Sequence, residues 1–342
     1  MIRIINFPPV ALIEDLGGFC GEAYFYARPI PPLKRHAEEE VMGARSYAAR
    51  KYRLAIKKLF PFFQRMGIHV VPNHFYEPVP DTRTLGEETW SKRSPMIGID
   101  IEDVKQQKIL AALASEYREE YDSFPQKKTA VPHEFSFEND SFGPVDAEML
   151  HCMVRHVKPK KVLEIGSGNS TYITAKSILR NKEEGHDCEL VCIEPYPNQV
   201  LRNGFPGLSR LIPSKMQDVP LSEFESLGEN DILFIDSSHM IKIGSDVQRI
   251  YLEILPVLRK GVVVHIHDIF LPSEYPRHWI MEYRMFWNEQ YLLQAFLTFN
   301  KDFEVLWGGS YMHLNHPEML QKSFKSYNRE TSWPGSFWIK RK

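Results

Sequence analysis

The sequence contains little cysteine and no long apolar run. Its four cysteines among 342 residues are too few for a disulfide scaffold, and Cys188 and Cys192 lack the spacing of a zinc knuckle or a redox pair. No run of about 18 apolar residues is present, and Glu14 and Asp15 stand where a signal peptide needs an apolar core. These absences predict a cytoplasmic protein of a reducing compartment with no membrane partner.

An excess of positive charge is also missing. Lys and Arg total 42 against 44 Asp and Glu, which gives a net charge of -2, whereas a binder of duplex DNA or tRNA usually carries a basic excess. We therefore expect no nucleic-acid partner. The hydrophobic fraction of 43% and the charged fraction of 25% are near globular averages, and the length allows about two domains.

Prolines punctuate the first 140 residues. Two helices are predicted between them, over about 33–59 and about 101–121, the second entered through acidic residues that suit a helix N-terminus. A loop is expected over 124–143. We interpret residues 1–140 as a mostly helical cap, in which the aromatic, proline-stiffened segment 72–81 is either a lid over a cleft or a surface connection.

From about residue 144 the sequence alternates between short apolar runs and helical segments. The runs are continuous, which is typical of strands covered on both faces, and strand–helix alternation predicts a parallel, doubly wound sheet. Helices are expected over 170–179, 245–259 and 279–299. Strands are expected at 161–165, 190–193, 210–212, 231–235, 261–266, 303–307 and 336–339.

The segment Gly166-Ser167-Gly168 ends the first of these strands, where open α/β sheets bind ligands. A dinucleotide fingerprint needs a third glycine three positions later, but Thr171 stands there. Carboxylates accompany the turn: Glu164 lies within the strand, Glu194 ends the second strand, and Asp218 follows the third. This set suits a ligand with an amino group, a ribose and an adenine, and without a pyrophosphate.

In order and spacing, these residues over about 145–342 resemble the motifs of the class I S-adenosylmethionine-dependent methyltransferases. The resemblance implies a Rossmann-like, seven-stranded sheet with the last strand antiparallel over residues 141–342, and S-adenosylmethionine as cofactor. It also implies that Glu164 and the glycine turn contact the methionine moiety, Glu194 the ribose hydroxyls and Asp218 the adenine, with Asp236 nearby.

A second group of polar residues follows two strands that are expected to be neighbours. Asp236 and His239 follow one strand, and His267 and Asp268 end the next, so the strand ends lie about 5 Å apart. Asp236 and Asp268 could share a divalent cation, while His239 or His267 could act as a base, with a pH-dependent limb between about pH 6 and 7. His265 is expected to be structural and to point away from His267.

This pattern resembles the metal-dependent O-methyltransferases that act on catechols and macrolide sugars. His267 stands where those enzymes carry an acidic ligand, which leaves a softer metal, or none, open. We expect methyl transfer to an oxygen of a small-molecule acceptor, by a chain that acts alone or as a homodimer. Trp287 and Tyr291 are expected in the core.

Three alternatives stay open at this point. The same donor motifs would serve aminocarboxypropyl transfer or cyclisation, which would release methylthioadenosine from the donor without an acceptor. A nicotinamide oxidoreductase is a second alternative, and Thr171 in place of the third glycine argues against it. A pure binding module is the third, and the convergence of ionisable groups argues against it.

Overall fold

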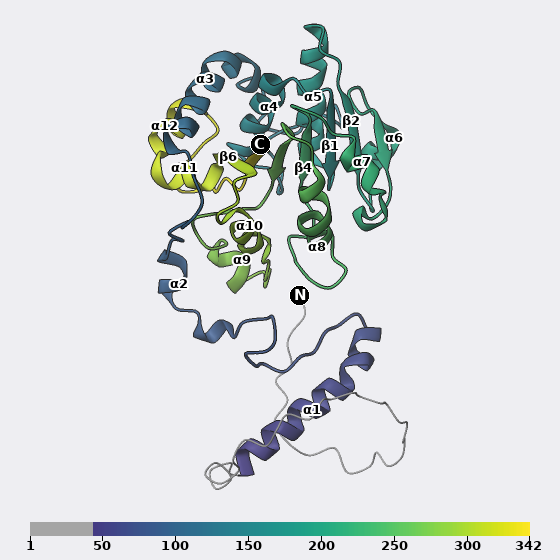
Figure 1. Cartoon of the computed structure of the whole chain (residues 1–342), viewed down its shortest axis with the longest axis vertical. Coiled ribbons are helices and arrows are strands. Elements are labelled where there is room, and N and C mark those ends of the chain that lie inside the picture. Colours follow the sequence, from purple (N-terminus) through teal and green to yellow (C-terminus); the bar gives the residue numbers. More distant parts are fainter. Residues whose placement is uncertain (1–43) are drawn as a thin grey trace. The chain divides into compact units, whose positions relative to one another are not determined.

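The computed structural model describes residues 44–342 (Figure 1), and the chain divides between Glu77 and Pro78 into two units. In the described part of the N-terminal unit, helix α1 (Ala44–Arg65) is followed by an irregular segment. The helix continues through Pro61, past the expected end near residue 59, although proline removes one backbone hydrogen bond there. The part of the expected helix before residue 44 lies outside the described residues.

The sheet unit, Pro78–Lys342, is built on seven strands in the order β3-β2-β1-β4-β5-β7-β6. Strands β1 to β5 pair in parallel, and β7 runs antiparallel between β5 and β6. This topology confirms the predicted Rossmann-like fold with its antiparallel last strand. The strands are β1 (Lys161–Ile165), β2 (Glu189–Ile193), β3 (Arg210–Ile212), β4 (Ile232–Ile235), β5 (Val263–Ile266), β6 (Phe303–Gly308) and β7 (Phe337–Arg341).

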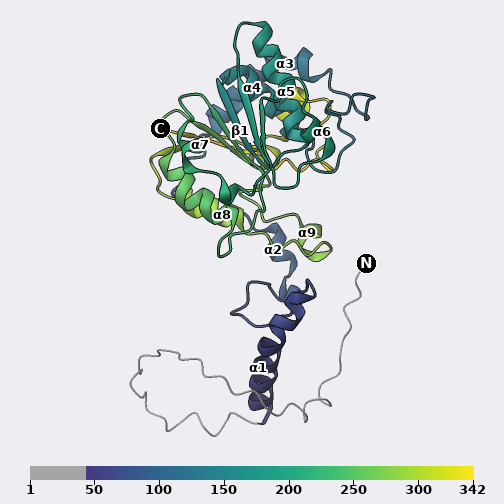
Figure 2. The same ribbon diagram turned by 90° about the vertical axis from the view of Figure 1, so that its right-hand side faces the viewer.

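Helices cover both faces of this sheet (Figure 2). Alternate residues of a strand point to opposite faces, so in β4 Phe234 packs into one core cluster while Leu233 and Ile235 pack into the other. The first cluster includes residues of α3 (Asp103–Tyr121), α4 (Asp146–Val157), α5 (Asn169–Glu183), α11 (Gly309–Asn315) and α12 (Pro317–Ser323). The second includes residues of α7 (Leu221–Glu225), α8 (Asp246–Arg249) and α10 (Glu289–Leu297).

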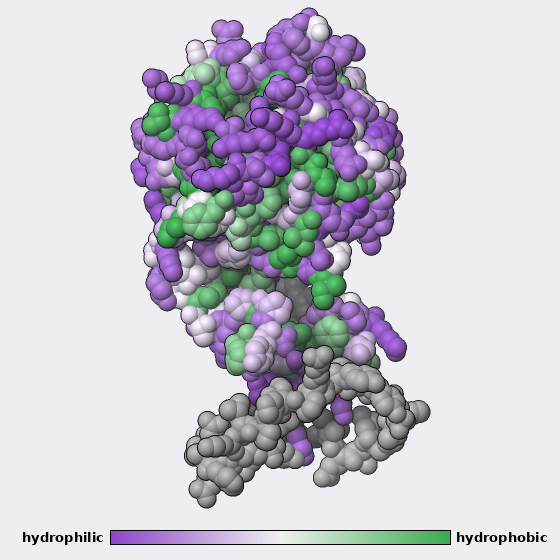
Figure 3. Space-filling view, in the orientation of Figure 1, coloured by the Kyte–Doolittle hydropathy of each residue, from purple (hydrophilic) through white to green (hydrophobic). Residues whose placement is uncertain are grey.

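The short helices α2 (Glu87–Ser91), α6 (Gln199–Asn203) and α9 (Arg277–Met281) complete the unit. Hydrophilic residues cover most of the face of the sheet unit that Figure 3 shows. None of the helices in the described part of the chain is long and apolar enough to cross a membrane.

The expected helix over 279–299 is wrong: α9 and α10 are separate, and residues 282–288 between them are irregular. The chain turns there because Arg284 has a left-handed φ of 60° and Asn288 leaves helical geometry to accept a hydrogen bond from the backbone N–H of Ile241, at 2.7 Å. The aromatic content suggested one continuous helix, but these contacts divide it. The expected helix over 245–259 also departs from a regular α-helix, since α8 continues as a π-helical turn over Ile250–Ile254.

Residues on both sides of the expected boundary at residue 140 share one core. Leu110 and Tyr117 of α3, together with Phe124 and Phe135 from the expected loop, pack in the first core cluster. The loop over 124–143 contains no helix or strand, as predicted. The sheet unit therefore includes residues 78–140 as well as the segment from residue 141 onward.

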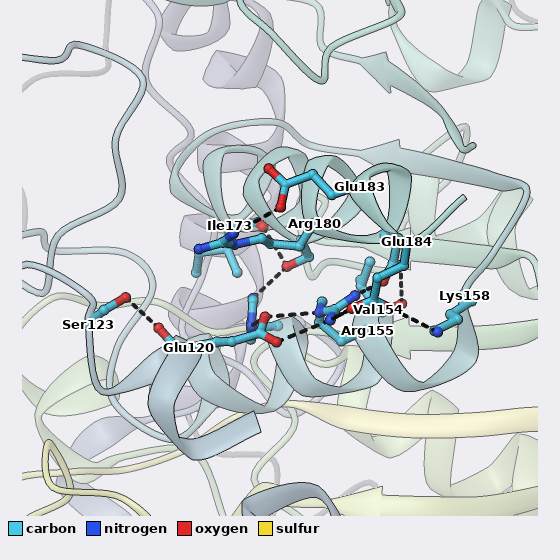
Figure 4. Close-up of polar contacts among 12 residues, drawn as sticks. Glu120, Ser123, Val154, Arg155, Lys158, Ile173, Arg180, Glu183 and Glu184 are labelled. Atoms are coloured by element: carbon cyan, nitrogen blue, oxygen red, sulfur yellow. Dashed lines mark hydrogen bonds and ion pairs between the residues drawn. The ribbon is translucent and has the colours of Figure 1, made fainter. Parts of the chain in front are cut away.

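A network of charged side chains fastens α3, α4 and α5 to one another (Figure 4). Arg155, which is 4% exposed, donates to both carboxylate oxygens of Glu120 and also binds Glu184. His151 Nε2 lies 3.0 Å from Glu120 Oε2. The hydrogen bond with His151 and the nearby Arg155 outweigh partial burial and lower the pKa of Glu120 to about 2.

We expect Glu120→Gln to lower the free energy of unfolding by about 2 kcal/mol at pH 7, because it removes a hydrogen-bonded charge beside Arg155. A depressed pKa gives stability that is present above the usual value of 4.5 and is lost as the pH falls toward about 2. Urea unfolding of both proteins from pH 7 to pH 2 measures this, with exposed Glu119→Gln as the control. A difference that persists undiminished at pH 2 would contradict the account.

Candidate active site

The glycine turn after β1 is shaped by its contact with the end of β4. Gly166 has a φ of 78°, and an ideal Cβ there would lie 1.7 Å from the backbone oxygen of Asp236. The amide of Asp236 donates to the carbonyl of Ile165 at 2.9 Å, which holds the two strand ends together. Thr171, in place of a third glycine, accepts a hydrogen bond from the backbone N–H of Gly168 at 2.9 Å. The turn therefore needs glycine at position 166 and uses the threonine hydroxyl as a cap.

A cavity of about 230 Å³ opens beside this turn. Glu194, at the end of β2, lies at its wall, where one carboxylate oxygen accepts the N–H of Ser167 at 3.3 Å and the other that of Tyr196 at 2.7 Å. The structure thus brings together Gly166, Ser167, Gly168, Glu194 and Asp236. The cavity is lined by Ser141, Phe142, Gly166, Ser167, Gly168, Asn169, Ser170, Glu194 and Asp236.

Two of the predicted cofactor-binding residues do not line this cavity. Glu164 is fully buried, where it accepts a hydrogen bond from the Ser170 hydroxyl at 2.6 Å. Burial raises the pKa of Glu164 to about 7. Asp218 is exposed and ends a one-turn 3-10 helix that follows β3. For both residues, contact with a cofactor stays a prediction.

The carboxyl ends of β4 and β5 hold the second group of predicted residues, and the structure brings all four side chains together. His239 Nε2 lies 3.1 Å from Asp236 Oδ1 and 3.4 Å from Asp268 Oδ2. His267 Nδ1 lies 3.7 Å from Asp236 Oδ1 and 3.6 Å from Asp268 Oδ1. Asp236 belongs both to this group, named here the His-Asp cluster, and to the wall of the cavity beside the glycine turn.

Three members of the His-Asp cluster fit a divalent cation. Asp236, His267 and Asp268 each offer one ligand atom, and these atoms lie within 4.8 Å of one another. The ring nitrogens of His267 are buried and have no hydrogen-bond partner among the described residues. One imidazole nitrogen, in its neutral form, and two carboxylate oxygens form a donor set that suits a metal of intermediate softness.

His239 forms hydrogen bonds with the start of α10, and the sequence analysis did not predict this contact. Its Nδ1 lies 2.9 Å from Glu289 Oε2, and Glu289 is fully buried. The amides of Asn288 and Glu289 donate to the carbonyl of His239, whose φ is 54°. Trp287, expected in the core, packs against the His239 ring with centroids 4.5 Å apart. In the sequence, the one sign of this contact is Glu289, an acidic residue beside an apolar stretch and 50 residues after His239.

The charges around the two histidines change their expected chemistry. Burial alone would lower the pKa of His239, but hydrogen bonds to Asp236 and Glu289 outweigh it and raise the pKa to about 10. Burial is likewise outweighed at His267, where Asp268 and Asp236 raise the pKa well above its usual value. The carboxylates thus favour the positively charged form of each ring, and the expected limb between pH 6 and 7 stays a prediction.

The expected orientation of His265 is also wrong. Its ring lies on the same side of β5 as that of His267, with centroids 5.8 Å apart, because residues two apart in a strand share a face. The expected structural role agrees with its surroundings. His265 is fully buried, and its Nε2 lies 2.9 Å from the Ser336 hydroxyl of the neighbouring β7 segment.

Comparison with known proteins places this geometry among methyltransferases. A family model described as a methyltransferase domain matches residues 163–269, a range that contains every predicted site residue. An uncharacterized protein from Archaeoglobus fulgidus is 33% identical over 168 residues, which are 47% of this chain and 75% of that protein.

Two solved structures are similar at lower sequence identity. A plantazolicin methyltransferase, in complex with a desmethyl analogue and SAH, is 12% identical with a TM-score of 0.37, covering 71% of this chain and 99% of its own. An O-methyltransferase from Bacillus cereus, in complex with SAH, is 16% identical with a TM-score of 0.33, covering 70% of this chain and 91% of its own.

We expect Gly166→Ala to lower the free energy of unfolding by about 2–4 kcal/mol, because it combines a left-handed φ with a clash against the backbone of Asp236. Gly168→Ala is the matched control, since an added Cβ there meets nothing within 4 Å. Chemical denaturation of the two variants measures the difference. Equal stability of both would show that the turn does not depend on this close approach.

Proposed function

The chain belongs to the class I S-adenosylmethionine-dependent methyltransferases, and we propose that it transfers the donor's methyl group to an oxygen atom of a small molecule. The observation that carries this proposal is the position of Asp236, which lines the cavity at the glycine turn and is a member of the His-Asp cluster. Because one residue serves both places, a donor in the cavity and an acceptor at the cluster would meet across it.

For the donor, we propose that the cavity holds the methionine moiety and the ribose. The glycine turn allows close approach of the ligand to the backbone, and the Glu194 carboxylate at the cavity wall accepts hydrogen bonds from the ribose hydroxyls. Asp218, exposed beyond β3, is assigned to the adenine. Glu164, buried beneath the turn, acts through Ser170 by fixing the start of α5.

For the acceptor, the chemical requirement is a nucleophilic oxygen aligned with an already activated methyl group. Asp268 is the proton acceptor in our proposal, since its side chain is 16% exposed and burial raises its pKa against the opposing effect of His267. His239 and His267 carry positive charge close to it and stabilise the negative charge that develops on the acceptor oxygen. This assignment replaces the base role that the sequence suggested for the histidines.

In an alternative arrangement, a divalent cation would replace a proton on His267 and would be held by Asp236, Asp268 and the neutral ring of His267. When bound, such an ion stabilises an alkoxide and lowers the pKa of the oxygen that it contacts. His239, itself held by Glu289, would then help to orient the two aspartates.

We propose that residues 78–140 of the sheet unit help to select the acceptor, and that the chain acts in the cytoplasm. Supporting this proposal, Ser141 and Phe142 of the loop over 124–143, which follows α3, line the cavity.

We expect Glu194→Ala to weaken binding of S-adenosylhomocysteine by about tenfold or more, because hydrogen bonds to a carboxylate contribute about 1.5–3 kcal/mol each. Isothermal titration calorimetry measures the affinity. Glu189→Ala, on the exposed start of the same strand, is the control and should bind normally. Unchanged affinity in the Glu194 variant would place the ribose elsewhere.

We expect the cation site to be detectable without turnover. Titration with Mn²⁺ or Zn²⁺ should show binding to the wild type, and Asp268→Asn should weaken it by about 10–100-fold. Asp302→Asn, at an aspartate that is 69% exposed and outside the cluster, should bind as the wild type does. Equal binding by all three proteins would locate the ion outside the cluster, and full activity in chelator would assign acceptor activation to the side chains alone.

A further inference from the structure

Helix α1 of the N-terminal unit carries positive charge and no negative charge. The stretch Ala44–Arg65 has Arg or Lys at seven positions and neither Asp nor Glu. Glu77 is the single acidic residue between residues 44 and 77. This concentration of positive charge lies within a chain whose net charge is -2, so the charge is strongly segregated.

One side of α1 is an apolar stripe. Tyr52, Ile56, Leu59 and Phe63 follow one another at intervals of three or four residues, so they lie on one face of the helix. No residue from Lys51 to Arg65 is buried. Tyr52 is 65% exposed and Leu59 is 45% exposed. Two further apolar residues continue the surface toward the C-terminal end of the helix: Phe62 and Met66, each 59% exposed.

The basic side chains lie outside this stripe. Arg53 and Lys57 are one turn apart on the polar side, and Lys58 is displaced from the stripe by about a quarter turn or more. Lys57 Nζ pairs with Glu77 at 3.2 Å, yet its side chain remains 62% exposed. The helix therefore presents an apolar face flanked by accessible cations.

The same unit exposes a group of aromatic rings. Phe75 and Tyr76 are 81% and 80% exposed, and their ring centroids lie 4.3 Å apart. The His74 ring lies 4.1 Å from that of Phe75. Exposed aromatic rings of this kind are favoured at the level of lipid headgroups, where an amphipathic ring contacts both water and acyl chains.

We propose that α1 binds the surface of an anionic lipid membrane, with its apolar stripe in the acyl boundary and its basic side chains among the headgroups. A basic helix with an apolar face lies in the interface plane without spanning the bilayer. Nucleic acid would use the cations but would leave the continuous apolar stripe without a partner. This proposal departs from the expectation of no membrane partner, since an interfacial helix needs one apolar face and no long apolar run. It does not depend on the proposed reaction.

Flotation of the full chain with lipid vesicles tests the proposal. We expect binding to vesicles of phosphatidylcholine mixed with phosphatidylserine, weak binding to phosphatidylcholine alone, and loss of binding as salt screens the charges. The double variant Lys57→Gln, Lys58→Gln should bind about thirtyfold more weakly, from about 1 kcal/mol for each cation. Arg180→Gln with Lys182→Gln, two exposed cations of α5, is the matched control and should bind as the wild type does.

The variant Leu59→Lys separates membrane insertion from simple charge attraction. It adds a positive charge, yet it should weaken binding about tenfold or more, because it places an ammonium in the apolar stripe. Leu252→Lys, at a leucine that is 61% exposed in the sheet unit, should not weaken it.

Three results would overturn the proposal. The first is that the wild type does not float with anionic vesicles. The second is that Leu59→Lys binds these vesicles more tightly than the wild type does. The third is that an RNA homopolymer, which binds Leu59→Lys and the wild type equally, releases the protein completely from vesicles. Sedimentation of a dimer that Leu59→Lys dissociates, without vesicle binding by the wild type, would instead identify a second copy of the chain as the occupant of the stripe.

Discussion

The contact between Gly166 and the backbone of Asp236 is the constraint on which the rest of the site depends. It brings the glycine turn after β1 against the end of β4, with the Asp236 amide bonded to the carbonyl of Ile165. This holds the backbone of Asp236 in place, so that its side chain lies between the cavity and the His-Asp cluster. One close backbone approach therefore couples the geometry of donor binding to the geometry of acceptor activation.

Charge compensation is the second requirement, because four ionisable groups are held together with little access to water. The imidazole rings of His239 and His267 lie against the carboxylates of Asp236 and Asp268, which raise the pKa of both histidines. Glu289 supports His239 at 2.9 Å, and Asp146 lies 3.5 Å from His267 Nε2 while accepting the amides of Gly335 and Ser336. The start of α4, the start of α10 and the segment before β7 thus all contribute to the electrostatics of one site.

The sequence was informative where function depends on short stretches of chain. Continuous apolar runs marked the strands, and the residues that follow them, such as Glu194 and Asp268, were found because parallel strands end at one edge of a sheet. Contacts between distant segments were not accessible in this way. Glu289 belongs to a helix 50 residues from His239, and the break before α10 depends on Asn288 bonding to Ile241. The raised pKa of each histidine depends on the carboxylates packed around it, which residue type alone does not reveal.

The central claim is that the donor's reactive sulfur and the His-Asp cluster meet across Asp236. A crystal structure with S-adenosylhomocysteine bound tests it most directly. We predict that the sulfur lies in the cavity beside the glycine turn and that the side of the sulfur that carries the methyl group in the donor faces Asp268. An acceptor oxygen at the cluster would then stand about 3–3.5 Å from the methyl carbon of the donor. A sulfur that faces away from Asp268, or a ligand bound outside this cavity, would contradict the account.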